Sequence, residues 1–142
     1  MIISAASAWI IAQIVKVFTG MFKDRRFSVR TLLFSNGGMP SSHSAAVTAL
    51  ATSSIILYGF NSFECAVTAV FAIIVMMDAS GVRYETGEQA KILNRITKEL
   101  FSGSSAEINT GLKELVGHTP FQVFVGAVLG IAVGIGLSFL MV

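Results

Sequence analysis

No charged residue interrupts the stretch TPFQVFVGAVLGIAVGIGLSFLMV, which occupies residues 119–142. A helix needs about 20 predominantly apolar residues to cross a membrane, so this stretch is long enough to do so. The whole chain shares this character, since 54% of its 142 residues are hydrophobic and 13% are charged. Soluble chains carry about 25% charged residues. The composition therefore predicts an all-α integral membrane protein, and it excludes a disordered chain and a disulfide-linked domain.

Three other segments are apolar enough to be membrane spans. They occupy residues 1–22, 44–60 and 62–79. The short turn Gly59–Ser62 joins the second span to the third, so we expect a helical hairpin there. The chain is thus predicted to be a single membrane domain over residues 1–142, with about four transmembrane helices.

The remaining polar stretch, residues 80–117, is predicted to form an amphipathic helix. Val82, Leu93, Ile96 and Leu100 recur near helical spacing, with charged residues on the other faces. An amphipathic helix between two spans is typical of a segment that lies at the membrane surface.

Small residues form a ridge along the last span. Gly126, Gly130 and Gly134 recur every fourth residue there. Such a ridge lets another helix approach closely. The partner is either a second span of the same chain or a second protomer, so a homo-oligomer is one of two alternatives.

The positive charge is confined to one predicted side of the membrane. All ten Lys and Arg residues lie before the second span or between the third and the fourth, and the opposite side carries only Glu64. Cytoplasmic segments carry such an excess, so we expect a multi-pass protein of the cell membrane whose two termini lie outside. The net charge of +2 is too small to indicate a nucleic-acid partner.

The first histidine lies where a glycine-rich loop leads into a span, in the sequence Asn36-Gly-Gly-Met-Pro-Ser-Ser-His-Ser44. Ser is a favoured helix N-cap, and a helix start presents unpaired N–H groups and the positive end of the helix dipole. Gly38, Ser41 and Ser42 therefore predict an anion site beside His43. The alternative interpretation is a turn followed by an ordinary cap.

The second histidine, His118, also precedes a span. In Gly117-His-Thr-Pro-Phe-Gln122, Thr119 suits the N-cap, Pro120 the first helical position and Gln122 the far end of a capping box. By the predicted topology both histidines lie at the cytoplasmic face, so we expect the two imidazoles and two helix starts to converge on one anion. A structural histidine before a capped helix is the alternative.

Six other charged residues are candidates for this site. Each has an alternative role: Lys16 can extend to the membrane interface, and Asp78 and Arg83 can pair only to tie a helix end. The basic loop residues can hold anionic lipid, and Glu114, four residues before His118, can be a solvated charge rather than a partner that orients the imidazole. The candidates are Lys16, Lys23, Arg30, Arg83, Asp78 and Glu114.

At these residues the chain resembles the type 2 phosphatidic acid phosphatase superfamily, which includes lipid phosphatases and vanadium-dependent haloperoxidases. It is most similar to the small divergent membrane branch. Pro40-Ser41-Ser42-His43 matches the superfamily motif Pro-Ser-Gly-His, and His118 fits the histidine of another motif. Lys23 and Arg30 match the spacing of a third. Similar blocks lie at Gly37–Ala45, Asp78–Arg83, Leu93-Asn94 and Gly117–Pro120.

The chain departs from the superfamily pattern at three positions. Gln122 stands where Asp is expected, Leu112 where Arg is expected, and Thr31 where Pro is expected. The candidates to replace the missing Arg are Lys113, one residue away in the chain, and Arg83, in space. The missing Asp and Arg favour a non-enzymatic role, whereas the two retained histidines favour catalysis.

The resemblance implies hydrolysis of a membrane lipid phosphate or pyrophosphate through a phosphohistidine. His118 would attack phosphorus, His43 would protonate the leaving oxygen, and Ser41, backbone amides and cationic side chains would hold the phosphoryl oxygens. No cofactor and no metal is implied. The alternatives are a non-enzymatic membrane protein that binds anionic lipid or a partner, and a vanadate-binding site like that of the haloperoxidases.

Overall fold

The computed structural model describes residues 1–24, 39–101, 112 and 117–141, and this part of the chain contains helices and no strand. The expected all-α class is therefore confirmed. The helices, in chain order, are α1 (Ile2–Asp24), α3 (Ser42–Tyr58), α4 (Phe63–Met77), the π-helical turn η1 (Asp78–Val82), α5 (Arg83–Phe101) and α6 (Pro120–Met141).

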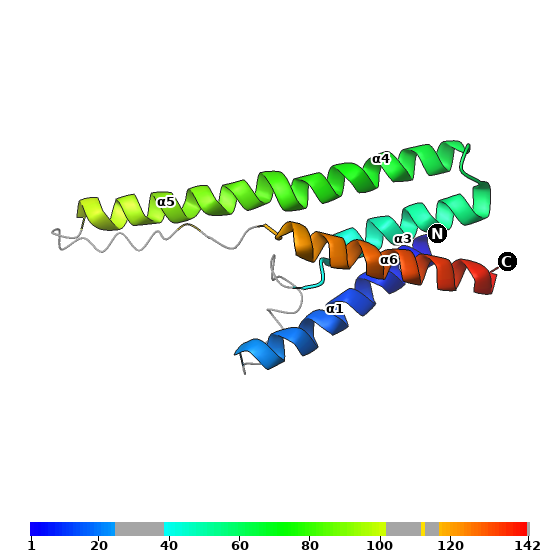
Figure 1. Cartoon of the computed structure of the whole chain (residues 1–142), viewed down its shortest axis with the longest axis horizontal. Coiled ribbons are helices and arrows are strands. Elements are labelled where there is room, and N and C mark those ends of the chain that lie inside the picture. The colour runs from blue at the N-terminus through cyan, green and yellow to red at the C-terminus, as the bar shows by residue number, and fades with distance from the viewer. Residues whose placement is uncertain (25–38, 102–111, 113–116, 142) are drawn as a thin grey trace.

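α3 lies at the centre of the bundle and packs against α1, α4 and α6. α6 runs parallel to α3, whereas α1 runs in the opposite direction and crosses obliquely (Figure 1). α4 returns along the other side of α3, and α5 continues it beyond the ends of the other helices. Both chain termini lie toward the end of the bundle that holds the α3–α4 turn.

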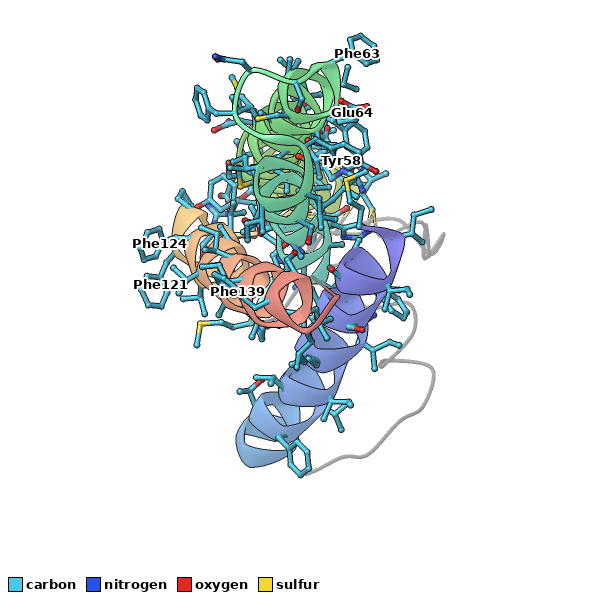
Figure 2. The ribbon with its side chains drawn as sticks, turned by 90° about the vertical axis from the view of Figure 1, so that its right-hand side faces the viewer. Tyr58, Phe63, Glu64, Phe121, Phe124 and Phe139 are labelled. Atoms are coloured by element: carbon cyan, nitrogen blue, oxygen red, sulfur yellow. The ribbon has the colours of Figure 1, made fainter. Side chains whose placement is uncertain are left out.

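The packing is inverted relative to a soluble protein. The buried side chains of the described residues are mostly Ala and Ser, whereas large apolar side chains cover the outside. Figure 2 shows Phe121 and Phe124 of α6 pointing away from the bundle, and both are 65% exposed. Helices in a membrane associate through small residues because lipid covers their large apolar side chains equally well. The burial pattern thus agrees with a membrane-embedded bundle.

Small residues at every fourth position, together with Lys16, form the contact between α1, α3 and α6. We call this contact the seam. All its members are buried, including Lys16, which is 8% exposed. They are Ser4, Ala8, Ala12 and Lys16 on α1, Ser41, Ala45, Ala49 and Ser53 on or capping α3, and Gly126, Gly130, Gly134 and Ser138 on α6.

The glycine ridge predicted in the last span is the α6 side of this seam. A Cβ atom at Gly126 would meet the carbonyl oxygen of Ser41, and one at Gly130 would meet that of Ala45. At Gly134 the added Cβ would lie 2.9 Å from the carbonyl oxygen of Ala49. Each step of four residues on α6 therefore matches one step of four on α3. The ridge packs within the chain, which is one of the two alternatives left by the sequence.

The hairpin between α3 and α4 forms as expected. Gly59 ends α3 with a φ of 87°, a left-handed conformation that favours glycine. Ser62 then caps α4, since its side chain accepts a hydrogen bond from the N–H of Cys65.

Three helical segments are long and apolar enough to cross a membrane: Ile2–Thr19, Phe63–Leu100 and Pro120–Leu140. α3 has 17 residues and lies along α6 over three steps of the seam. The apolar residues 44–60 predict that α3 is a fourth membrane span. Its packing along α6 supports this prediction.

The third predicted span ends at residue 79, where the sequence changes from apolar to polar, but no helix ends there. The helix is continuous over Phe63–Leu100, and α5 extends α4 in nearly the same direction (Figure 1). No proline lies between Phe63 and Phe101, so nothing in the backbone forces the helix to end where the polar residues begin. The amphipathic helix expected in residues 80–117 is present as α5, and its position at a membrane surface stays a prediction.

We expect Gly130→Ala to destabilise the bundle, because the new methyl group would meet Thr48 and the Ala45 carbonyl. Overpacking of this kind costs about 1–3 kcal/mol. Gly136→Ala is the matched control, since its Cβ would meet nothing within 4 Å. Thermal or denaturant unfolding of the purified protein in detergent measures both. Equal stability of the two variants would contradict the packing of the seam.

Candidate functional site

The starts of α3 and α6 lie side by side at one end of the seam. The N–H of Ser41 donates a hydrogen bond of 3.1 Å to the carbonyl oxygen of Gln122. Gly126 allows the same stretch of α6 to approach the Ser41 carbonyl. His43 is the second residue of α3, and His118 lies two residues before α6. Both histidines are therefore held at the same end of the bundle.

The loop before α3 is fixed by α1. The hydroxyl of Thr19 donates a hydrogen bond of 2.8 Å to the carbonyl oxygen of Met39. Together with the bond from Ser41 to Gln122, this contact ties the Met39–Ser41 segment to both α1 and α6.

Ser41 caps α3, as the sequence predicts. Its Oγ accepts hydrogen bonds from the N–H of Ser44 at 3.4 Å and from the Ser44 hydroxyl at 2.9 Å. Both Ser41 and Ser42 are almost fully buried, whereas His43 is exposed. The N–H groups of Ser42 and His43 lie in the first turn of α3, where an α-helix offers no intrahelical acceptor. At this helix start an anion can therefore meet backbone N–H groups and the His43 ring.

His118 is 5% exposed and is held at both its backbone and its ring. Its N–H donates a hydrogen bond of 3.0 Å to the carbonyl oxygen of Ala79 in η1. Its Nδ1 lies 3.2 Å from Oε1 of Gln122. The same Oε1 accepts the N–H of Thr119 at 3.2 Å, and Thr119 Oγ1 accepts the N–H of Gln122. Gln122 thus completes the predicted capping box and also contacts the imidazole.

This arrangement selects one tautomer of His118. The Thr119 N–H requires an oxygen at the shared Gln122 position, so the side-chain amide cannot be flipped. An amide oxygen only accepts hydrogen bonds, so Nδ1 of His118 must carry the proton. The lone pair of the neutral ring then lies on Nε2, the nitrogen that Gln122 does not contact.

The surroundings of His118 favour this neutral form. Burial lowers the pKa of the His118 imidazole below its ordinary value of 6.5, and the charges of Lys16, His43 and Arg83 act in the same direction. The hydrogen bond to Gln122 opposes these effects by stabilising the protonated ring. On balance these surroundings favour the uncharged imidazole of His118.

Two predicted cationic residues lie close enough to act on both histidines. Burial, Arg83 and Lys16 lower the pKa of the His43 imidazole, as burial and the same two charges lower the pKa of His118. The Asp78 carboxylate opposes this at His43 and favours the protonated ring that a general acid requires. Lys16 is buried at the end of the seam beside the α3 start, and Arg83 begins α5. Arg83 Nε also pairs with Asp78 Oδ2 at 2.5 Å, although both side chains are about half exposed.

Position 112, where the superfamily pattern has an Arg, is held away from the histidines. The side chain of Asn94 accepts the Leu112 N–H at 2.8 Å and donates to the Leu112 carbonyl at 2.9 Å. Asn94 lies ten residues beyond Tyr84 on α5, which corresponds to about 15 Å of helix. Position 112 is therefore too far from the imidazoles to take part in the site. The guanidinium of Arg83 is near enough for its charge to act on both rings.

Some predicted site residues cannot be placed. Gly38, Arg30 and Glu114 lie outside the described residues, and Lys23 lies in the last turn of α1 with a side chain that is not described. Within the described ranges, no group of three or more His, Cys, Asp and Glu residues could hold a metal ion.

No pattern in the sequence predicts the backbone contacts that hold His118. Neither the Ala79 carbonyl nor the Asn94 contact with Leu112 has a signature in residue type or spacing. Gly117, directly before His118, is the one local signal, because a glycine beside a functional residue often marks a close backbone approach.

Residues 1–133 match the family described as Divergent PAP2. The chain is also 40% identical, over 148 aligned residues, to YuiD, an uncharacterised membrane protein of Bacillus subtilis strain 168. That alignment covers 97% of this chain and 93% of the relative. No solved structure shows a significant match to the chain. The resemblance indicated by the histidine motifs is thus confirmed, and the chain belongs to the divergent PAP2 family.

Proposed function

We propose that this protein hydrolyses the phosphate ester or pyrophosphate of a membrane lipid, with His118 as the nucleophile and His43 as the general acid. The observation that carries the proposal is the state of His118. Its Nδ1–H is directed to Gln122, which leaves the lone pair of the uncharged ring on Nε2, and burial lowers the pKa of this ring. A histidine that served only to bind an anion would be more useful in its protonated form.

The reaction proceeds in two balanced steps. In the first, Nε2 of His118 forms a bond to phosphorus, the bond to the lipid oxygen breaks, and His43 gives that oxygen its proton. In the second, His43 takes a proton from a water molecule, whose oxygen attacks phosphorus and breaks the phosphorus–nitrogen bond. Inorganic phosphate leaves, and both histidines return to their starting states.

Positive charge around the site would stabilise the phosphoryl oxygens during both steps. Lys16 and Arg83 supply full charges, and the first-turn N–H groups of α3 supply partial ones. Phosphoryl transfer depends mainly on such positioning and charge stabilisation, so it requires few reacting groups from the protein. The lipid-facing exterior of the bundle favours a substrate that arrives from the membrane.

One observation favours a second candidate function at the same site. Gln122 accepts the Nδ1–H of His118 without a negative charge, whereas an Asp there would stabilise the imidazolium formed after attack. The site would then bind a lipid phosphate without cleaving it. Phosphate release by the purified protein from a panel of polyprenyl and glycerolipid phosphates and pyrophosphates separates the two functions. Binding of these lipids with no release would favour the second.

We expect His118→Ala to abolish both turnover and any trapped phosphoenzyme. His43→Ala should slow lipid phosphates far more than activated aryl phosphates, whose leaving groups need no proton. General-acid help is worth about 10²–10⁴-fold, so the contrast should be large. Steady-state assays with both substrate types measure it. Equal losses on both would mean that His43 is not the acid.

The hydrogen bond from His118 to Gln122 predicts opposite effects of two substitutions. Gln122→Ala should lower the pKa of His118 further, because the acceptor that stabilises the protonated ring is lost. Gln122→Glu should raise it, because a carboxylate adds a negative charge. The chain has two histidines, so NMR titration of histidine-labelled protein resolves both rings, and His43→Gln identifies them.

Turnover per folded molecule provides the second measurement on these variants. Gln122→Ala should reduce it by about 10-fold or more, which corresponds to roughly 1.4 kcal/mol. A loss of stability with unchanged titration and unchanged turnover would show that Gln122 acts only as a helix cap.

We further propose that the histidine end of the bundle faces the cytoplasm, because all Lys and Arg lie on that predicted side. In a Cys65→Ala background, a membrane-impermeant thiol reagent applied to intact cells should label Asn61→Cys and not Gln89→Cys. Both positions are exposed, one in the α3–α4 turn and the other on α5. The reverse labelling pattern would invert the proposed orientation.

A further inference from the structure

The π-helical turn η1 interrupts the regular hydrogen bonding of the long helix formed by α4 and α5. In an α-helix the carbonyl oxygen of Ala79 would accept the N–H of Arg83. In this structure that N–H donates instead to Asp78, five residues earlier. The carbonyl of Ala79 accepts the N–H of His118. The wider turn thus allows a helix carbonyl to bond a residue outside the helix.

The residue before His118 lies directly on the same helix. A Cβ atom at Gly117 would meet the backbone N and Cα of Tyr84 and the carbonyl carbon of Arg83. These are backbone atoms in the first turn of α5, so they cannot move aside as a flexible side chain would. Gly117 is therefore required for space: it lets the chain carrying His118 touch the helix backbone.

A third contact holds the chain farther along α5. The side chain of Asn94 bonds both the N–H and the carbonyl of Leu112. The helix thus contacts the chain at Leu112 and again at Gly117 and His118. The position of His118 relative to the α3 start is set from the α4–α5 side as well as through Gln122.

From these contacts we infer that η1 and the first turn of α5 form a bracket that positions His118, with the Ala79 carbonyl and the space at Gly117 as its two essential parts. Both are positioning elements, since neither touches the reacting atoms. The catalytic consequence rests on the proposed function. The structural consequence, that His118 loses its fixed place when the bracket is disturbed, does not.

Gly117→Ala tests the bracket, and Gly136→Ala is the matched control because its Cβ meets nothing within 4 Å. Full-length protein labelled with ¹⁵N-histidine reports both the backbone amide and the ring of His118. In Gly117→Ala we expect faster hydrogen exchange of the His118 amide. We also expect its ring pKa to rise toward its ordinary value as burial is lost. Gly136→Ala should match the wild type in both.

Turnover gives a separate readout. Misplacing a catalytic group by about 1 Å can lower a rate about 100-fold, so Gly117→Ala should mainly lower kcat and leave KM little changed. If the NMR changes occur but the wild type releases no phosphate, the bracket is supported and the proposed function fails. If phosphate is released and Gly117→Ala leaves the His118 amide and ring unchanged, the bracket is wrong.

The wild type keeps the inference testable even if Gly117→Ala does not fold. The bond to Ala79 requires the His118 amide to exchange more slowly than the amide of an exposed loop residue. If the His118 amide hydrogen of the folded wild-type protein exchanged as fast as that of an unprotected amide, the inference would be overturned.

Discussion

The close approach of α3 and α6 is the constraint on which the rest of the structure depends. Glycines on α6 rest against successive carbonyl oxygens of α3, and in this contact the two helices run parallel in one register. Parallel helices begin at the same end of the bundle. Two histidines that are far apart in the sequence, each beside a helix start, are consequently brought to one place. The site thus depends on glycine, alanine and serine residues, which are small enough to allow this approach.

The site shows a division between the two histidines. His118 is buried and bonded through Nδ1, whereas His43 is exposed beside the helix start. The same Gln122 oxygen serves a helix cap and an imidazole, which explains how an uncharged residue can occupy this position without loss of order. Gln122 holds the ring through its amide oxygen and brings no negative charge. In the proposed mechanism, the departure from the superfamily pattern would weaken stabilisation of the imidazolium rather than the geometry of attack.

Local signals in the sequence predicted most of the helices. The charge-free run predicted α6, Gly59 predicted the hairpin, and Ser41, Thr119 and Gln122 predicted two helix starts, because each of these effects involves residues that are close in the chain. The sequence also predicted the ridge of glycines on α6, but it did not predict which helix packs against this ridge. Which helix fills a ridge depends on contacts between distant segments, and residue spacing within one helix carries no information on that.

The bracket around His118 could not be predicted for a different reason. A π-turn differs from an α-helix by one hydrogen-bond step, and the residues Asp78–Val82 include no proline or other residue that requires it. The change from apolar to polar residues at residue 80 marks the predicted end of a membrane span, and the helix itself continues through it. The burial of Lys16 likewise follows from the helices packed around it.

The three serines at the far end of the seam have a consequence for how the bundle moves. Ser4, Ser53 and Ser138 are buried, and within the part of the chain that the structure describes their hydroxyl oxygens have no hydrogen-bond partner. A buried hydroxyl without a partner costs about 1–3 kcal/mol. At the opposite end, Ser41, Thr119 and His118 are bonded across helices or to helix backbone. Local opening should therefore start at the serine end, so that the helices separate there while the histidine end stays assembled.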